Sequence, residues 1–209
     1  MANEDLSDSL ESARIAAVMI IDDFRRAVPA AQALIRGGIT HIELALRTDH
    51  SMDALKAIVD EVPQMVVGAG TVLSPEQVEA IKEAGASFAV SPGLNADVVA
   101  AADSASLPFA PGVATPTDIE RAYNLGCRTL KLFPAEPLGG PTYLRSVNAA
   151  YRHLGLRFIP LGGVNLENIN RWLSMPEVVA VGGSWICNRA LIEQERCEEI
   201  EGRAREAMD

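Results

Sequence analysis

A lysine, Lys131, interrupts the apolar run Thr129–Pro134, where a solvated charge has no obvious place. Burial disfavours an ammonium ion, so a lysine in such a run tends toward the neutral amine, and a neutral amine is a nucleophile toward ketones. Lys131 is therefore a candidate Schiff-base former. The competing interpretation is a lysine at a strand end that lays its methylene stem on apolar surface and keeps its ammonium group in water.

An acidic and a basic side chain, Glu43 and Arg47, lie in another apolar run, His41–Thr48. Alternation with a period of two places both on one face of a strand and the apolar residues on the other. We expect the apolar face to meet helices and the Glu43 face to point into the interior. A buried carboxylate needs a cation or hydrogen bonds. Glu43 is therefore predicted to transfer protons, or to form an ion pair with Arg47 or Lys131 that only fixes geometry.

Small residues end three further apolar runs. In Gly68–Thr71 they would let a ligand approach the backbone, with the Thr71 hydroxyl as a donor, although crowding in a narrow interior explains them equally. Two other runs end in Gly162-Gly163 and in Gly182–Ser184, which leaves backbone N–H groups unshielded. Unshielded amides suit an anion, so we predict a phosphate site there. Ordinary turns are the alternative.

These residues fall at the ends of a repeated pattern of elements. A short apolar run, a turn and a segment with helical periodicity alternate along the chain. Helix starts are readable at Ser74-Pro75, at Thr115-Pro116 and at Asn165. The apolar runs, eight in number, are Ala16–Ile21, His41–Leu46, Met65–Thr71, Phe88–Pro92, Pro108–Val113, Thr129–Pro134, Arg157–Gly163 and Val178–Ser184.

Eight β/α units predict an α/β fold of the (β/α)8 TIM barrel type, with an extra N-terminal helix over Met1–Ala13 that closes the amino-terminal end. The active site of such a barrel lies at the carboxyl ends of its strands. A doubly wound open sheet is the alternative, but the even repeat and the lack of a G-x-G-x-x-G motif after the first run disfavour it. No linker or low-complexity tract interrupts the pattern, so residues 1–209 are predicted to form a single domain.

The composition narrows the classes of partner. The chain has 209 residues, of which 48% are hydrophobic and 22% charged, which suits one well-buried core. Its net charge of -10 disfavours nucleic acid and membrane surfaces as partners. Cys127, Cys187 and Cys197 form no C-x-x-C pair, which disfavours a disulfide framework or a cysteine zinc site. The acidic, polar residues Met1–Ser12 and the lack of a membrane-spanning apolar run predict a cytoplasmic protein.

The chain resembles the family of 2-keto-3-deoxy-6-phosphogluconate (KDPG) aldolases, which also includes 4-hydroxy-2-oxoglutarate (KHG) aldolases. The resemblance runs from about Ala16 to Arg205, and it implies a class I aldolase of (β/α)8 fold. It also implies a homotrimer that acts on a small 2-keto acid and needs no metal or other cofactor. The motifs, in the family's order, are Glu43-Leu-Ala-Leu-Arg47-Thr48, Gly68-Ala-Gly-Thr71, Val90-Ser-Pro92-Gly93, Lys131-Leu-Phe133-Pro134-Ala-Glu136, Gly162-Gly163 and Gly182-Gly183-Ser184-Trp185.

The resemblance implies a role for each matching residue. Lys131 resembles the Schiff-base lysine and Glu43 the general acid/base, which together would cleave KDPG to pyruvate and glyceraldehyde 3-phosphate. Arg47 and Thr71 resemble the groups that hold the substrate carboxylate. The remaining matches resemble the pocket-lining residues, Pro92 and Phe133, and the phosphate contacts, Gly162, Gly163 and Ser184.

Two departures from the family pattern leave other substrates open. Leu161 stands where gluconate-type enzymes carry a threonine near the C4 hydroxyl, and galactonate-type relatives have an aliphatic residue there. Ile20 stands where some relatives place an arginine near the phosphate. The alternatives are therefore KHG and 2-keto-3-deoxy-6-phosphogalactonate. From other classes, a non-covalent phosphate-binding barrel isomerase and a metabolite-binding barrel without catalysis also remain.

Overall fold

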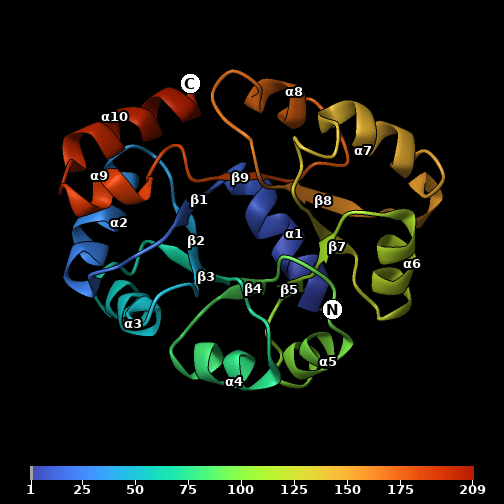
Figure 1. The fold of residues 1–209 in the computed structure, drawn as a ribbon, viewed down its shortest axis with the longest axis horizontal. Coiled ribbons are helices and arrows are strands. Elements are labelled where there is room, and N and C mark those ends of the chain that lie inside the picture. Colours follow the sequence, from blue (N-terminus) through green and yellow to red (C-terminus); the bar gives the residue numbers. More distant parts are fainter. Residues whose placement is uncertain (1) are drawn as a thin grey trace.

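Parallel strands gather at the centre of the molecule and helices surround them (Figure 1). The computed structural model describes residues 2–209, with side chains from Leu6 onward. The strands are β1 (Ile15–Met19), β2 (His41–Ala45), β3 (Val66–Gly70), β4 (Phe88–Val90), β5 (Phe109–Ala110), β6 (Gly112–Val113), β7 (Thr129–Leu132), β8 (Arg157–Pro160) and β9 (Val181–Gly183).

The helices after β1 form the outer layer, whereas α1 precedes β1 and lies at the centre of the view (Figure 1). They are α1 (Ala2–Ala13), α2 (Ala27–Arg36), α3 (Ser51–Glu61), α4 (Pro75–Glu83), α5 (Ala96–Ser104), α6 (Pro116–Asn124), α7 (Gly140–Asn148), α8 (Ile169–Leu173), α9 (Arg189–Glu193) and α10 (Cys197–Met208), with 3-10 turns η1 (Phe24–Arg26) and η2 (Arg152–Leu154). Among the described residues, no helix is both long enough and apolar enough to cross a membrane.

All strand pairs are parallel and form a curled sheet. One part has the order β5-β4-β3-β2-β1-β9 and the other β6-β7-β8. Isolated parallel bridges join Phe158 to Val178 and Leu161 to Gly182, and so connect β8 with the segment around β9. Because helices cover a parallel sheet of this kind from outside, the fold is a TIM-like barrel.

The packing divides β1 between two apolar clusters. Alternate residues of β1 belong to a large cluster with the surrounding helices, and the residues between them belong to a smaller cluster with Leu6 and Leu10 of α1. Ile42 and Leu44 of β2 lie in the large cluster. The period of two predicted this place for the face of the strand opposite Glu43. A polar side chain on the inward face is therefore enclosed by the barrel.

Two helix starts predicted from the sequence are confirmed. Ser74 caps α4 and Thr115 caps α6, each through a capping box with the residue three positions later and with proline in the first turn. The start predicted at Asn165 is wrong, because α8 begins at Ile169. The Asn165 side chain accepts a hydrogen bond from the Glu167 amide and closes a turn instead. The predicted first helix begins at Met1, which lies outside the described residues.

Two strand boundaries also differ from the prediction. The run Pro108–Val113 contains two strands, β5 and β6, separated by Pro111, which has no N–H group to give to the ladder. The carbonyl of Pro111 still accepts a hydrogen bond from the Lys131 amide at 2.9 Å, so the neighbouring strand remains attached across the break. The last run begins at Val181 and not at Val178, which makes only the isolated bridge to Phe158.

Candidate active site

Lys131 of β7 and Glu43 of β2 meet inside the barrel. Lys131 Nζ donates to Glu43 Oε1 at 2.9 Å, and the two side chains are 3% and 4% exposed. The alternative in which the lysine ammonium lies in water is therefore wrong, and the partner of Glu43 is Lys131 and not Arg47. An amine and a carboxylate in direct contact, shielded from solvent, can exchange a proton with each other and with a bound ligand.

The glycines of β3 make room for Glu43. A Cβ atom at Gly70 would lie 2.1 Å from Glu43 Oε1 and 2.6 Å from its Cγ. A Cβ atom at Gly68 would lie 2.1 Å from the Phe88 ring. Close contacts of this kind exclude any larger residue, so crowding accounts for both glycines. Gly70 is therefore a residue whose importance for the pair the sequence did not reveal.

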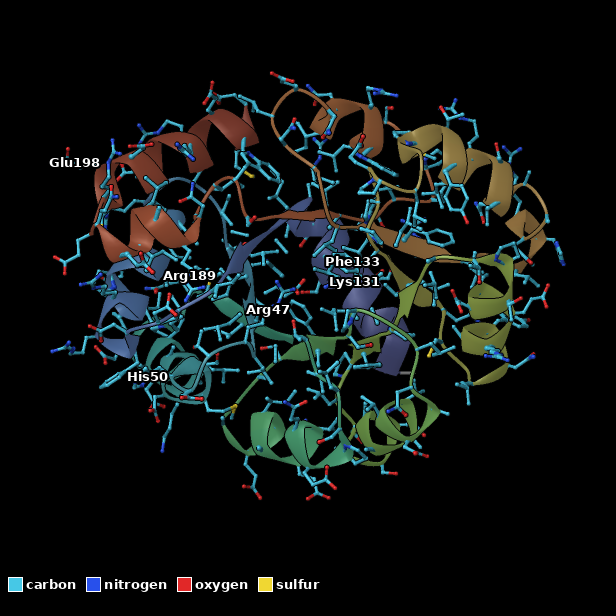
Figure 2. The ribbon with its side chains drawn as sticks, viewed as in Figure 1. Arg47, His50, Lys131, Phe133, Arg189 and Glu198 are labelled. Atoms are coloured by element: carbon cyan, nitrogen blue, oxygen red, sulfur yellow. The ribbon has the colours of Figure 1, made fainter. Side chains whose placement is uncertain are left out.

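Arg47 and Thr71 meet at the carboxyl ends of β2 and β3. Because β2 ends at Ala45, Arg47 belongs to the loop that follows and its side chain is exposed, in contrast to the predicted place on the strand. Arg47 Nε donates to Thr71 Oγ1 at 3.0 Å. Thr71 has φ of +61°, a conformation that a threonine adopts only when its surroundings enforce it. In Figure 2 Arg47 and Lys131 both lie toward the centre, inside the ring of helices.

Phe133 and Pro92 lie in the loops that follow β7 and β4. Lys131 Nζ is 5.4 Å from the centroid of the Phe133 ring, within reach of a cation–π contact, and the two residues lie together in Figure 2. Pro92 follows β4, and its carbonyl carbon and oxygen lie so close to Gly112 that a Cβ atom there would be 2.2 Å from both. The loop after β4 is thus pressed against β6, beside the backbone that pairs with Lys131.

The glycine loop after β8 is held open for backbone contacts. Gly162 and Gly163 have φ of +91° and +86°, which only glycine adopts readily. Among the described residues, the amides of Gly163 and of Ser184 donate no hydrogen bond within the chain. The Ser184 side chain is exposed after β9. These groups are free donors at the carboxyl ends of two adjacent strands, which is the arrangement that an anion requires.

Leu161 separates the glycine loop from the interior. Its side chain is 5% exposed and packs in the inner apolar cluster. A Cβ atom at Gly182 would lie 2.6 Å from Leu161 Cδ2, so the glycine of β9 leaves space for this leucine. At this position the interior of the barrel therefore presents a hydrocarbon surface and no hydrogen-bonding group.

Glu136 connects the glycine loop with α8, a contact that the sequence did not indicate. Trp172 Nε1 donates to Glu136 Oε1 at 2.7 Å, and Trp172 is fully buried. The Glu136 amide donates to the Gly162 carbonyl at 3.0 Å, and a Cβ atom at Gly163 would lie 2.6 Å from Glu136 Cβ. Glu136 thus supports the loop from beneath. The only sequence signal was its place in the motif that begins at Lys131.

An ion pair borders the mouth on the side of β1. Arg189 of α9 pairs with Asp22, two residues after Ile20 in the loop that follows β1. The hydrogen bond from Arg189 lowers the pKa of Asp22. Figure 2 shows Arg189 farther from the centre than Arg47 and Lys131. Among the described residues, no group of three or more His, Cys, Asp or Glu side chains is arranged to hold a metal ion.

The sequence matches the family model described as KDPG and KHG aldolase over residues 6–202. It is 40% identical over 197 residues to the 2-dehydro-3-deoxy-phosphogluconate aldolase of Pseudomonas aeruginosa. The aligned region covers 94% of this chain and 89% of the relative. It is 36% identical over 200 residues to the KHG/KDPG aldolase of Escherichia coli, and this aligned region covers 96% of this chain and 93% of the relative.

The fold is similar to that of a solved KDPG aldolase from Legionella pneumophila. The two chains superpose with a TM-score of 0.91 at 32% identity, over 95% of this chain and 96% of the other. That aldolase was captured at low pH with pyruvate as a covalent carbinolamine intermediate. A carbinolamine is the adduct that an amine forms with a ketone, so the similarity extends to a protein with Schiff-base chemistry.

Proposed function

The chain belongs to the KDPG and KHG aldolase family, and from this premise we propose that it is a class I aldolase that cleaves KDPG to pyruvate and glyceraldehyde 3-phosphate. It is a carbon–carbon lyase of the aldolase type. The observation that carries the covalent mechanism is the contact of Lys131 Nζ with Glu43 Oε1 at 2.9 Å inside the barrel. An amine that is shielded from solvent and has a proton acceptor beside it is prepared to attack a ketone.

Lys131 is the proposed nucleophile. Transfer of its proton to Glu43 leaves a neutral amine, which attacks the C2 ketone of the substrate and forms a carbinolamine. Glu43 returns the proton to the departing hydroxyl, water leaves, and an iminium ion remains on Lys131 Nζ. The positive nitrogen of the iminium can then accept the electron pair of the bond that breaks next.

Glu43 is the proposed general base and acid of the cleavage step. It takes the proton of the C4 hydroxyl, the C3–C4 bond breaks, and its electron pair moves into the iminium to give the enamine of pyruvate. Glyceraldehyde 3-phosphate leaves as the aldehyde. Protonation of C3 and addition of water then release pyruvate and restore the amine of Lys131. One carboxylate can serve both directions of proton transfer because it is held beside the reacting nitrogen.

The substrate carboxylate is the proposed ligand of Arg47 and Thr71. The guanidinium of Arg47 offers a planar fork of donors to a carboxylate, and its contact with Thr71 at 3.0 Å keeps both groups at the barrel mouth. Phe133 and Pro92 are proposed to line the path to Lys131. In this arrangement Arg47 positions the keto acid and transfers no proton.

The substrate phosphate is the proposed ligand of Gly162, Gly163 and Ser184. The free amides of Gly163 and Ser184 and the Ser184 hydroxyl supply donors without an arginine at position 20, where this chain has Ile20. Because this site is built largely from backbone, KHG, which has no phosphate, is the principal alternative substrate. The Escherichia coli relative is named for both substrates.

Leu161 bears on the choice between epimers at C4. A leucine cannot hydrogen-bond the C4 hydroxyl, and discrimination between epimers depends on leaving an unmatched polar group unsatisfied. We therefore expect weak discrimination between KDPG and the galactonate epimer. Leu161→Thr should increase the preference for one epimer, measured as the ratio of kcat/KM values in a lactate dehydrogenase coupled assay for pyruvate. An unchanged ratio would mean that Leu161 does not determine the choice between the epimers.

Five broader features belong to the same proposal. We propose a closed (β/α)8 barrel in which β5 and β6 are two halves of one strand, and the bridges from β8 to the β9 segment support closure. Helix α1 is proposed to cover the amino-terminal end, where Leu6 and Leu10 enter the inner cluster. A single domain over residues 1–209, a homotrimer and a cytoplasmic location remain predictions, and light scattering after size-exclusion chromatography tests the trimer.

Reductive trapping tests the covalent mechanism. Pyruvate and sodium borohydride should add one reduced pyruvate adduct to the protein, on the peptide that contains Lys131, as read by mass spectrometry. Lys131→Ala should form no adduct and have no activity. Glu43→Gln should trap slowly and turn over poorly, since the carboxamide cannot accept the proton. The absence of an adduct at saturating pyruvate would favour a non-covalent isomerase or a binding protein.

A further inference from the structure

The loop after β9 carries one part of the proposed phosphate site, yet little holds its backbone. Residues 184–187 connect β9 with Asn188, the cap of α9. Within the part of the chain that the structure describes, no backbone group of residues 184–187 forms a hydrogen bond with another backbone group. In that set the backbone of the segment has one hydrogen bond, in which Nη1 of Arg203 in α10 donates to the Trp185 carbonyl at 2.7 Å.

The loop after β8, which carries the other part of the site, is held by more contacts. The Gly162 carbonyl accepts from the Glu136 amide at 3.0 Å. The Gly163 carbonyl accepts from Asn168 Nδ2, also at 3.0 Å. Loss of one side chain would therefore leave this loop with a backbone contact, whereas loss of Arg203 would leave the segment 184–187 with none from the described residues.

Packing fixes the two ends of the segment around Ser184. Ile186 and Cys187 are fully buried. A Cβ atom at Gly183 would lie 1.8 Å from Cζ3 of Trp185, so the indole ring lies directly on the last residue of β9. Ser184 lies between these two residues and is exposed. A backbone stretch without hydrogen bonds of its own resists local movement poorly. A fixed Trp185 carbonyl therefore restricts the directions in which the adjoining Ser184 can point its amide and hydroxyl.

Arg203 is itself held in one orientation. Its Nη2 donates to Glu199 Oε1 at 2.7 Å, so the planar fork of the guanidinium joins α10 to the loop. The helix is a firm base, because Ile200 and Ala204 are fully buried and a Cβ atom at Gly37, after α2, would lie 2.4 Å from Ala204 Cβ. Glu199 balances the charge of Arg203, so the arginine acts on the loop through its geometry.

We propose that Arg203 is a positioning residue of the phosphate site. It contacts no substrate, but by holding the Trp185 carbonyl it keeps the Ser184 amide and hydroxyl turned toward the substrate phosphate. This inference rests on the proposed function and deepens it, because it makes binding of the phosphorylated substrate depend on α10. The covalent step at Lys131 does not depend on the same contact. Pyruvate and KHG have no phosphate, so neither should respond to a change at Arg203.

Steady-state kinetics of Arg203→Leu test the proposal in the lactate dehydrogenase coupled assay. The variant loses the donor and should raise KM for KDPG about tenfold, while kcat changes by less than about twofold. The kcat/KM for KHG and the rate of borohydride trapping with pyruvate should stay unchanged. Arg203→Lys keeps a donor of similar reach and should recover part of the loss.

Arg205→Leu is the matched control. Arg205 lies in the same helix and donates to Glu201, four positions earlier, at 2.8 Å, as Arg203 does to Glu199. Among the described residues, the Arg205 side chain has no hydrogen bond to the β9 loop. Arg205→Leu removes the same charge and a comparable ion pair, so KM for KDPG should stay at its original value.

Three results would overturn the role of Arg203. They are an unchanged KM for KDPG in Arg203→Leu, an equal rise in Arg205→Leu, and an equal loss of activity with KHG or of pyruvate trapping. If Arg203→Leu does not fold, Arg203→Gln is judged by the same results, since its side chain is too short to bridge Glu199 and the Trp185 carbonyl. Absence of both KDPG cleavage and the pyruvate adduct in the unmodified protein would instead overturn the proposed function, and this inference with it.

Discussion

Replacement of Gly70 by alanine should disable the enzyme through one carboxylate. The new methyl carbon would lie 2.1 Å from Glu43 Oε1, whereas an ordinary contact begins at 3.4 Å, so the oxygen must retreat by about 1.3 Å. The same carbon would lie 2.6 Å from Glu43 Cγ, which prevents a simple rotation of the carboxylate. The backbone at Gly70 does not have a positive φ, so alanine is tolerated there apart from this clash.

The displacement sets the expected loss of activity. A retreat of that size from a contact of 2.9 Å takes Glu43 Oε1 out of hydrogen-bond range of Lys131 Nζ. Misplacement of a catalytic group by about 1 Å can cost roughly a hundredfold in rate. We therefore expect Gly70→Ala to lower kcat by about a hundredfold, measured with KDPG as pyruvate release coupled to lactate dehydrogenase.

Two comparisons separate this effect from a general loss of structure. Gly202→Ala makes the same chemical change in α10, where a Cβ atom meets nothing within 4 Å, and should leave kcat unchanged. Gly70→Ala added to Glu43→Gln should cost little more than Glu43→Gln alone, because both changes remove the same interaction. A folded Gly70→Ala protein with the unmodified kcat, or full additivity of the two changes, would refute the reasoning.

Three further predictions concern stability and reactivity. Burial lowers the pKa of His41 below 6.5, so the free energy of unfolding should fall as the pH drops from about 6.5 toward the lowered pKa. The fall should be no more than about 1.4 kcal/mol per pH unit. Urea unfolding at several pH values should show a weaker fall for His41→Gln, and equal slopes would contradict this. Burial raises the pKa of Cys127 to about 11 and of Cys187 to about 12, so a thiol reagent should label Cys197 first in the native protein, as peptide mapping would show. Glu136→Ala leaves the indole N–H of Trp172 without its acceptor and should lower the free energy of unfolding, measured by urea titration, by about 1–3 kcal/mol. Glu136→Gln keeps an acceptor oxygen and should retain most of the original free energy of unfolding. Equal losses in the two variants would mean that the contact is unimportant.

The local sequence pattern was sufficient to predict that Glu43 and Lys131 lie in the interior. A period of two placed Glu43 opposite the apolar face of its strand, and an isolated charge in an apolar run marked Lys131. The contact between them follows from parallel strands that enclose one interior. Arg47 was placed on the strand because the alternation continues to it, but β2 ends two residues earlier, and periodicity carries no information about where a ladder stops.

Contacts between distant segments were not predictable in the same way. Glu136 and Trp172 come from a loop and a short helix, and neither lies in a periodic segment that would reveal its partner. Asn165 had the chemistry of a helix cap, yet asparagine also closes turns, and only the path of the chain selects between the two. The role of Gly70 depends on a side chain of the neighbouring strand, which no single run of sequence contains.

The ion pair between Glu43 of β2 and Lys131 of β7 also has a consequence for synthesis of the chain. Glu43 emerges from the ribosome 88 residues before Lys131, so the early strands carry an inward carboxylate that has no cation. A buried charge whose partner is absent costs several kcal/mol. A half-made chain therefore cannot adopt the finished packing around Glu43 until Lys131 has been synthesised.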